Sequence, residues 1–186
     1  MAWIDVIDED AAEGDLAEHY RRILERTGGI GNFSRGFSLR PHMLDAIMTA
    51  YFDACFHPDN ALPPWFHEAV ASYVSVLNGC AFCVAHHNAA ILKYAPDRNF
   101  ALAVIGAIAA DAPEKVFDGN ELAAMEYVRQ LTLDPGSVAE GDIAALRDAG
   151  LNDGEILEIN TTVGVFAWAN RYVSGVGISL EGEKLG

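Results

Sequence analysis

Hydrophobic side chains recur every three to four residues along most of this chain, with polar residues between them. That spacing puts the apolar positions on one face of a helix, whereas the strict alternation typical of strands is scarce. Glycine and proline interrupt the pattern at 28–31, 58–64, 111–119 and 134–141, where we expect helices to end. The pattern predicts helices at about 14–28, 40–56, 62–78, 80–94, 99–110, 119–132, 139–150 and 153–177.

These stretches predict an all-α fold of about seven or eight helices in a single domain over residues 1–186. A chain of 186 residues is long enough to bury a sizeable core. Residues 28–36, GGIGNFSRG, are rich in glycine but lack the Lys-Ser/Thr of a phosphate-binding loop and follow a helix rather than a strand. We therefore expect residues 28–36 to be a plain loop between two helices.

The amino-acid composition limits the kinds of binding partner that we expect. The chain is 51% hydrophobic and carries a formal net charge of −15, which repels phosphate backbones and anionic lipid headgroups. This argues against nucleic acid and membrane surfaces as partners. The first twenty residues are acidic with no apolar run, so no secretory signal is expected. We expect a cytoplasmic protein, whose three cysteines stay reduced and are too few for a disulfide scaffold.

Two cysteines and two histidines fall within the ten residues NGCAFCVAHH, 78–87. At about 100° per residue, Cys80, Cys83 and His87 share one helix face, whereas His86 points away from His87 and is expected to cap or pack. Cys83 and His87 are one turn apart and can touch. The helix is expected to begin near Cys80, and both a helix N-terminus and a nearby imidazole lower the pKa of a thiol.

This cluster allows three interpretations. A zinc site would use Cys80, Cys83 and His87, but it needs a fourth ligand and no second ligand pair follows at the usual spacing. Plain core packing would use none of their chemistry. A redox-active dithiol accounts for two adjacent thiols beside a base, and it is the interpretation that we favour. Cys55, alone among aromatic residues on an apolar helix, is expected to be a buried small hydrophobe.

The stretch HEAVASYVSVLNGCAFCVAHHNAAI resembles the core of the alkyl hydroperoxidase D-like group within the carboxymuconolactone decarboxylase-like superfamily. It is most similar to the members called uncharacterised peroxidase-related enzymes. The pattern there is a glutamate, then C-x-x-C twelve residues later, then a histidine four residues after the second cysteine. The matching residues here are Glu68, Cys80, Cys83 and His87.

The resemblance covers about residues 28–182, since the closing helix with Asn170 and Arg171 also matches loosely. It implies a helical bundle that assembles as a homo-oligomer, with thiol peroxidase or disulfide reductase activity and no haem, metal or other cofactor. In that family the second cysteine attacks the peroxide, the first resolves the sulfenate, and the histidine and glutamate relay the proton. Carried over, these roles fall to Cys83 as the peroxidatic residue, Cys80 as the resolving residue, and His87 and Glu68 as the relay.

Two positions depart from the family. Phe82 stands where the prototype has a histidine between the cysteines, and His67 stands where the peroxidase-related group often has arginine. Glu68 can reach the motif only if its helix packs antiparallel to the next one. We expect Cys83 to have the lower pKa, because the adjacent imidazole outweighs the helix dipole, and Cys80 to be the more exposed thiol.

Taken together, these features predict reduction of hydroperoxides by the Cys80–Cys83 dithiol, an antioxidant-type activity sustained by an unidentified thiol or dithiol reductant. Two alternatives remain open. One is a lactone decarboxylase on the same fold, and the other is a metal-stabilised or ligand-binding helical module with no turnover.

Overall fold

The computed structural model describes residues 2–183 and 185, and all regular structure in this part of the chain is helical. The described residues include three short 3-10 helices: η1 (Glu9–Ala11), which precedes the first α-helix, and η2 (Pro113–Lys115) and η3 (Pro135–Ser137), which lie between later α-helices. The α-helices are α1 (Gly14–Thr27), α2 (Asn32–Gly36), α3 (Pro41–Phe56), α4 (Pro64–Leu77), α5 (Ala81–Tyr94), α6 (Arg98–Ala109), α7 (Gly119–Leu133), α8 (Glu140–Asp148) and α9 (Asp153–Val176).

The predicted all-α fold is confirmed, and eight of these helices coincide with predicted stretches to within a few residues. The plain loop expected at 28–36 is wrong, because this segment contains α2. A helix of five residues completes little more than one turn, so no apolar period marks it in the sequence. Its Phe33 ring packs edge-on against Tyr172 of α9 at a centroid distance of 5.3 Å, a tertiary contact that stabilises the turn.

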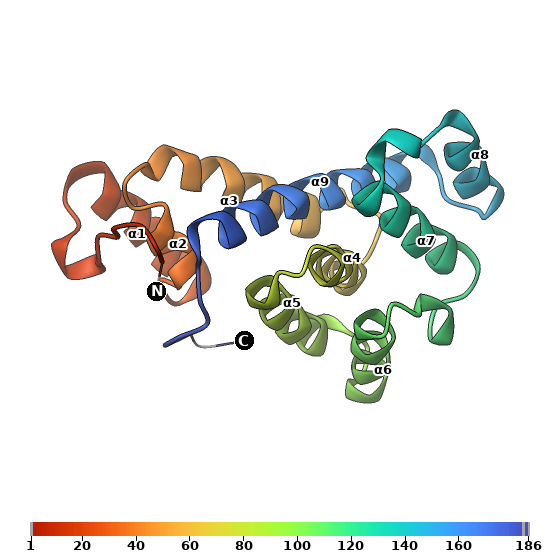
Figure 1. Cartoon of the computed structure of the whole chain (residues 1–186), viewed down its shortest axis with the longest axis horizontal. Coiled ribbons are helices and arrows are strands. Elements are labelled where there is room, and N and C mark those ends of the chain that lie inside the picture. The colour runs from red at the N-terminus through yellow and green to blue at the C-terminus, as the bar shows by residue number, and fades with distance from the viewer. Residues whose placement is uncertain (1, 184, 186) are drawn as a thin grey trace.

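Helix α4 forms the centre of the molecule. Residues 66–75 are buried without interruption, which is the pattern of a helix covered on all sides. In Figure 1, α4 is seen nearly end-on, with α3, α5, α6, α7 and α9 packed around it. A polar side chain on α4 therefore lies in the interior, where it needs a hydrogen-bond partner from a neighbouring helix.

The long helix α9 spans much of the molecule and packs along α3 and α4 (Figure 1). It begins with a capping box, in which the Asn152 side chain accepts hydrogen bonds from two backbone N–H groups and the Glu155 carboxylate accepts one from the Asn152 backbone N–H. It ends at Gly177, whose φ of +68° and close approach to the Trp3 ring both require glycine. The β-branched run at 159–166 is helical, as the flanking pattern predicted.

A tight joint connects α4 to α5. Gly79 has a φ of +71°, in the left-handed region, and the Cys80 N–H donates to the Ser75 carbonyl at 2.9 Å. The joint reverses the chain, so that α5 runs back along α4. Residues near the start of α4 can therefore meet residues in the second turn of α5.

Candidate active site

The two cysteines of the motif open α5. Cys80 is the N-cap residue and Cys83 lies in the first turn. Both thiols are free and both residues are buried, with exposed fractions of 2% and 4%. They belong to a small apolar cluster with Phe82, Val173 and Ile178. The expectation that Cys80 is the more exposed thiol is wrong, because side chains from α9 and from the start of the chain cover this end of α5.

The two thiols of the motif have different pKa values. The Cys83 thiol donates a hydrogen bond to the Cys80 sulfur, and this bond lowers the pKa of Cys80 to about 7. The Ser174 side chain and His87 act in the same direction, against the effect of burial. The same hydrogen bond, together with burial, raises the pKa of Cys83 above its ordinary value. As pH rises through about 7, the pair therefore takes on one negative charge centred on Cys80, with the remaining proton on Cys83.

This order of pKa values is opposite to the expectation from the sequence. The i, i+4 spacing of Cys83 and His87 favoured Cys83 as the more acidic thiol. The structure adds a direct hydrogen bond between the thiols, and that bond stabilises the anion on its acceptor, Cys80. The anion therefore sits at the helix N-terminus, where backbone N–H groups and the helix dipole also favour it.

The His87 ring is hydrogen-bonded to a buried carboxylate. Glu68 of α4 is fully buried, and its Oε2 lies 2.6 Å from Nδ1 of His87, which is 19 residues further along the chain. Helices α4 and α5 run antiparallel, which is the arrangement that Glu68 needs to reach the motif, and this brings the two residues together. A carboxylate only accepts hydrogen bonds, so Nδ1 carries the hydrogen and Nε2 of His87 is left as an acceptor.

Tyr51 of α3 holds the other oxygen of this carboxylate. Its hydroxyl donates to Glu68 Oε1 at 2.9 Å, and its ring lies edge-on to His87 at a centroid distance of 6.2 Å. Burial, reinforced by the charge of Glu68, raises the pKa of Tyr51 well above its ordinary value, so the hydroxyl remains a donor. Nothing in the sequence marks Tyr51 for this site, since only the packing of α3 against α4 brings it there.

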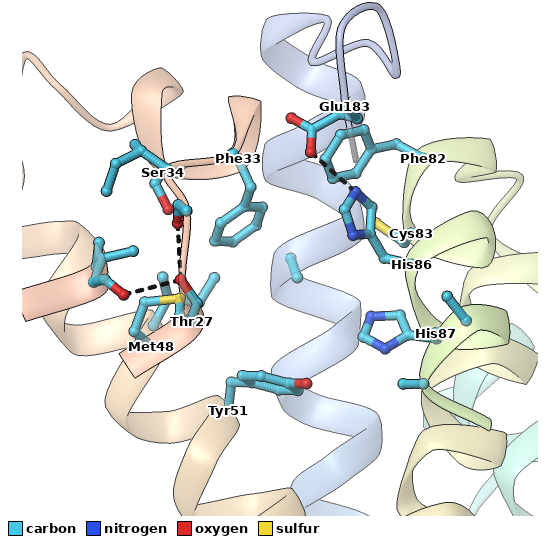
Figure 2. Close-up of a pocket in the computed structure, with 18 of the residues that line it drawn as sticks. Thr27, Phe33, Ser34, Met48, Tyr51, Phe82, Cys83, His86, His87 and Glu183 are labelled. Atoms are coloured by element: carbon cyan, nitrogen blue, oxygen red, sulfur yellow. Dashed lines mark hydrogen bonds and ion pairs between the residues drawn. The ribbon is translucent and has the colours of Figure 1, made fainter. Parts of the chain in front are cut away.

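Cys83, His87 and Tyr51 line a cavity of about 790 Å³. Figure 2 shows Met48 and Tyr51 of α3 on one wall, with the side chains of α5 opposite. The lining is mostly apolar and includes several aromatic rings, and Cys80 is not part of it. Of the two cysteines of the motif, Cys83 is therefore the one that a molecule in the cavity meets.

His86 lines the same cavity. Its ring packs on Phe82 at a centroid distance of 4.5 Å, as the expected packing role implies, and its Nε2 lies 3.5 Å from a Glu183 oxygen. Figure 2 shows Glu183 beside His86. Glu183 lies in the segment that follows α9. No spacing in the sequence connects Glu183 to the motif, so Glu183 could not be predicted as a neighbour of His86.

Phe82 and most of residues 28–36, also singled out in the sequence, line the cavity, whereas Cys55, Asn170, Arg171 and His67 do not. Cys55 is buried as expected, and burial raises the pKa of its thiol. The Asn170 side chain is buried and accepts from the Ser75 hydroxyl at 3.0 Å, whereas Arg171 lies at the surface. His67 is buried against Thr162 of α9, so the departure from arginine affects packing rather than the cavity wall.

Within residues 2–183 and 185, no three side chains of His, Cys, Asp or Glu come together in a way that could hold a metal ion. The zinc interpretation of Cys80, Cys83 and His87 therefore gains no support from the geometry. Over the same residues, no helix has both the length and the apolar character needed to cross a bilayer.

Comparison with protein families gives one match. Residues 41–130, from the start of α3 to near the end of α7, match the Carboxymuconolactone decarboxylase family. This segment contains the cysteine pair, His87 and Glu68. None of the curated proteins compared with the chain matches it.

Several solved structures share the whole fold. An uncharacterized peroxidase-related protein from Silicibacter sp. TM1040 superposes with a TM-score of 0.80 and 21% identity, covering 96% of this chain and 91% of that chain. An alkylhydroperoxidase AhpD core protein, likewise peroxidase-related and uncharacterized, from Ralstonia eutropha JMP134 gives a TM-score of 0.82 with the same identity and coverage. The debrominase Bmp8, in a cysteine-to-alanine variant bound to 2,3,4-tribromopyrrole, gives a TM-score of 0.74 and 17% identity, covering 95% of this chain and 90% of that chain.

Proposed function

We propose that this chain, a member of the alkyl hydroperoxidase D-like and carboxymuconolactone decarboxylase-like superfamily by its family match and its fold, reduces organic hydroperoxides in an antioxidant role. The observation that carries the proposal is the position of Cys83. It faces an apolar cavity, hydrogen-bonds to a second thiol, and lies one helical turn from an imidazole backed by a buried carboxylate. This arrangement is that of an activated thiol with a base and an orienting group.

In the first step, Cys83 passes its proton to Cys80 along the hydrogen bond between them and becomes the attacking thiolate. Its sulfur forms a bond to the terminal oxygen of the hydroperoxide, and the O–O bond breaks. The terminal oxygen keeps its hydrogen and becomes the sulfenic acid of Cys83. His87 holds the proton that the dithiol lost when Cys80 ionised, and it gives this proton to the alkoxide, which leaves as the alcohol.

In the second step, the Cys80 thiol attacks the sulfur of the Cys83 sulfenic acid. The S–S bond forms, the S–O bond breaks, and the hydroxyl leaves with the thiol proton as water. An external thiol or dithiol then reduces the disulfide by exchange and closes the cycle. The cytoplasm, which is the compartment that we expect, would supply such a reductant.

The size of the cavity favours an organic hydroperoxide over hydrogen peroxide. About 790 Å³ falls in the range of pockets that bind small organic molecules. Hydrogen peroxide would leave most of this apolar space unfilled. An alkyl or aryl group would bury its surface against Met48 and the aromatic rings of the lining, and that burial contributes to binding.

Glu68 supports the role of His87. By accepting from Nδ1 it fixes the tautomer and turns Nε2 away from itself. Tyr51 in turn holds the carboxylate by its other oxygen. The imidazole is therefore held in one orientation, a state in which it can take up the thiol proton and return it to the alkoxide.

A count of free thiols tests the proposal. The reduced protein has three, and one equivalent of cumene hydroperoxide should remove two of them and produce one equivalent of alcohol. Cys55→Ser should behave as the wild type, with two thiols before and none after. Loss of no thiol would overturn the proposal. Turnover of a lactone that survives removal of Cys80 and Cys83 would instead favour the decarboxylase branch.

A second candidate is reductive dehalogenation of a halogenated aromatic ring. The aromatic lining of the cavity and the shared fold of a debrominase bound to tribromopyrrole favour it. In this reaction the dithiol is oxidised to a disulfide while carbon–bromine becomes carbon–hydrogen, with release of bromide and a proton. Bromide release from tribromopyrrole, matched by loss of two thiols and absent in Cys83→Ser, would support this candidate.

A further inference from the structure

His86 belongs to the site, yet the relay through His87 and Glu68 gives it no part. Its ring lines the cavity, and it lies three residues after Cys83, so both residues project from one side of α5. The Nε2 atom of His86 is buried without a hydrogen-bond partner, although the Glu183 carboxylate lies 3.5 Å away. Phe82 packs against the ring and limits its rotation.

Glu183 is held in place by the helix α2. The side chain of Glu183 is only 4% exposed, and its carboxylate accepts a hydrogen bond from the backbone N–H of Asn32. The Asn32 side chain also donates to the carbonyls of Ser179 and Glu181, each at 2.9 Å. Three hydrogen bonds thus fasten the segment after α9 to the start of α2 and fix the carboxylate beside His86.

The carboxylate determines which nitrogen of His86 carries the hydrogen. Because Glu183 only accepts, the facing Nε2 is the N–H, and Nδ1 is the acceptor. Burial lowers the pKa of His86 and so favours the neutral ring, in which Nδ1 is an acceptor when the hydrogen lies on Nε2. On the side away from Glu183, the ring faces the interior of the site near Cys83 and His87 (Figure 2). Glu183 therefore orients the His86 ring as Glu68 orients the His87 ring. The acceptor nitrogen is Nδ1 in His86 and Nε2 in His87.

We propose that Nδ1 of His86 accepts the hydrogen bond of the hydroperoxide O–H and so holds the terminal oxygen against the sulfur of Cys83, with Glu183 as the residue that positions the ring. This inference rests on the proposed hydroperoxide reductase activity and adds the recognition of the reacting group to it. The hydrogen stays on the terminal oxygen throughout. It ends on the sulfenic acid of Cys83, and His86 undergoes no net change.

The test compares two oxidants of the same dithiol. Cumene hydroperoxide has the O–H that His86 would bind, whereas dithiodipyridine oxidises thiols and has no O–H. In His86→Leu the rate of oxidation by cumene hydroperoxide should fall by roughly tenfold, as expected for one lost hydrogen bond, while the rate with dithiodipyridine stays at the wild-type value. Glu183→Gln should give the same selective loss in smaller degree.

A conservative variant separates the hydrogen bond from packing. The amide oxygen of asparagine can occupy the place of Nδ1, so His86→Asn should recover most of the rate that His86→Leu loses with hydroperoxide. Glu181→Gln, in the same segment but exposed, is the matched control and should leave both rates unchanged.

Equal losses with both oxidants, or no loss with hydroperoxide in either His86 variant, would overturn the role of His86. A wild-type protein that reacts with dithiodipyridine but with no hydroperoxide would instead remove the proposed function itself. The two failures are therefore distinguishable.

Discussion

Cys80 and Cys83 lie one helical turn apart on α5, yet Cys83 faces the cavity while the lower thiol pKa belongs to Cys80. Cys83 thus has access to the substrate, whereas Cys80 carries the negative charge, and the two thiols are hydrogen-bonded. When the Cys83 proton moves along this bond to Cys80, the thiolate forms on Cys83, where the substrate binds. The division of roles between the two cysteines can be measured directly.

Cys80→Ser should accumulate a sulfenic acid on Cys83 after one equivalent of cumene hydroperoxide, because the resolving sulfur is absent. Dimedone trapping with mass spectrometry would locate the adduct. Cys83→Ser should give no adduct on Cys80 at a comparable rate, since Cys80 is not part of the cavity lining. An adduct on Cys80 of Cys83→Ser at the wild-type rate would reverse the two roles.

The ultraviolet absorbance of the thiolate should increase with pH around a midpoint near 7, the lowered pKa of Cys80. The sign follows from the chemistry, because the thiolate is the absorbing form and its fraction grows as pH rises through the pKa. Cys83→Ala removes the hydrogen-bond donor, so the midpoint should move up toward that of an ordinary thiol, about 8.5. Cys55, whose pKa burial raises, should contribute no thiolate in this range. A midpoint in Cys83→Ala at or below the wild-type value would contradict the thiol–thiol bond.

Glu68→Gln should keep the fold and slow the oxidation of the dithiol by cumene hydroperoxide about 100-fold, within the usual range for acid–base assistance. Tyr51→Phe should slow it by roughly threefold to tenfold, because the carboxylate keeps its bond to His87 and loses one donor. Stopped-flow measurement of thiol loss would give both rates.

Ser72→Ala is the matched control for these variants. Ser72 makes another hydrogen bond between α4 and α5, to Asn88 at 2.7 Å, and it does not line the cavity. Its removal should leave the rate unchanged. A rate in Glu68→Gln equal to that of Ser72→Ala would remove Glu68 from the mechanism.

We expect the protein to be a homo-oligomer that buries part of its exposed apolar surface. Leu157 and Trp168 are 66% and 43% exposed on α9, and their separation of about three turns puts them on the same side of this helix. Sedimentation at micromolar concentration should show a species larger than the 20.1 kDa chain. Trp168→Glu should shift the population toward the single chain, because a buried unpaired carboxylate weakens an interface. A wild-type protein that sediments only at 20.1 kDa would refute this expectation.

The sequence predicted the long helices well, because each carries several turns of apolar period between glycine and proline. Helical spacing also brought Cys83 and His87 together, whereas only the family resemblance added Glu68 to them. The short helix α2 was missed because it is too brief to show a period. Tyr51 was missed because its place at the site depends on how distant helices pack.

The order of the thiol pKa values also escaped prediction, for a different reason. Helical spacing places Cys83 near His87, but it does not show that the Cys83 thiol donates to Cys80 inside a buried cluster. Burial and hydrogen-bond direction are tertiary properties, and each shifts a thiol pKa by as much as a neighbouring imidazole does. His86 illustrates the same limit, since its angle to His87 predicted packing and gave no hint of the carboxylate that meets it.

The carboxylate beside His86 comes from the segment that follows α9 and not from the helical core. Substitutions at and around Glu183, beyond the Ile178 side chain that packs with Cys83, can therefore reshape one wall of the cavity without disturbing the packing that holds Cys83 and Glu68. Sequence changes near Glu183 can therefore alter which substrates the cavity accepts while Cys80, Cys83 and their neighbours stay the same. The same independence makes this segment the natural starting point for engineering altered selectivity, and it argues for attaching affinity tags elsewhere.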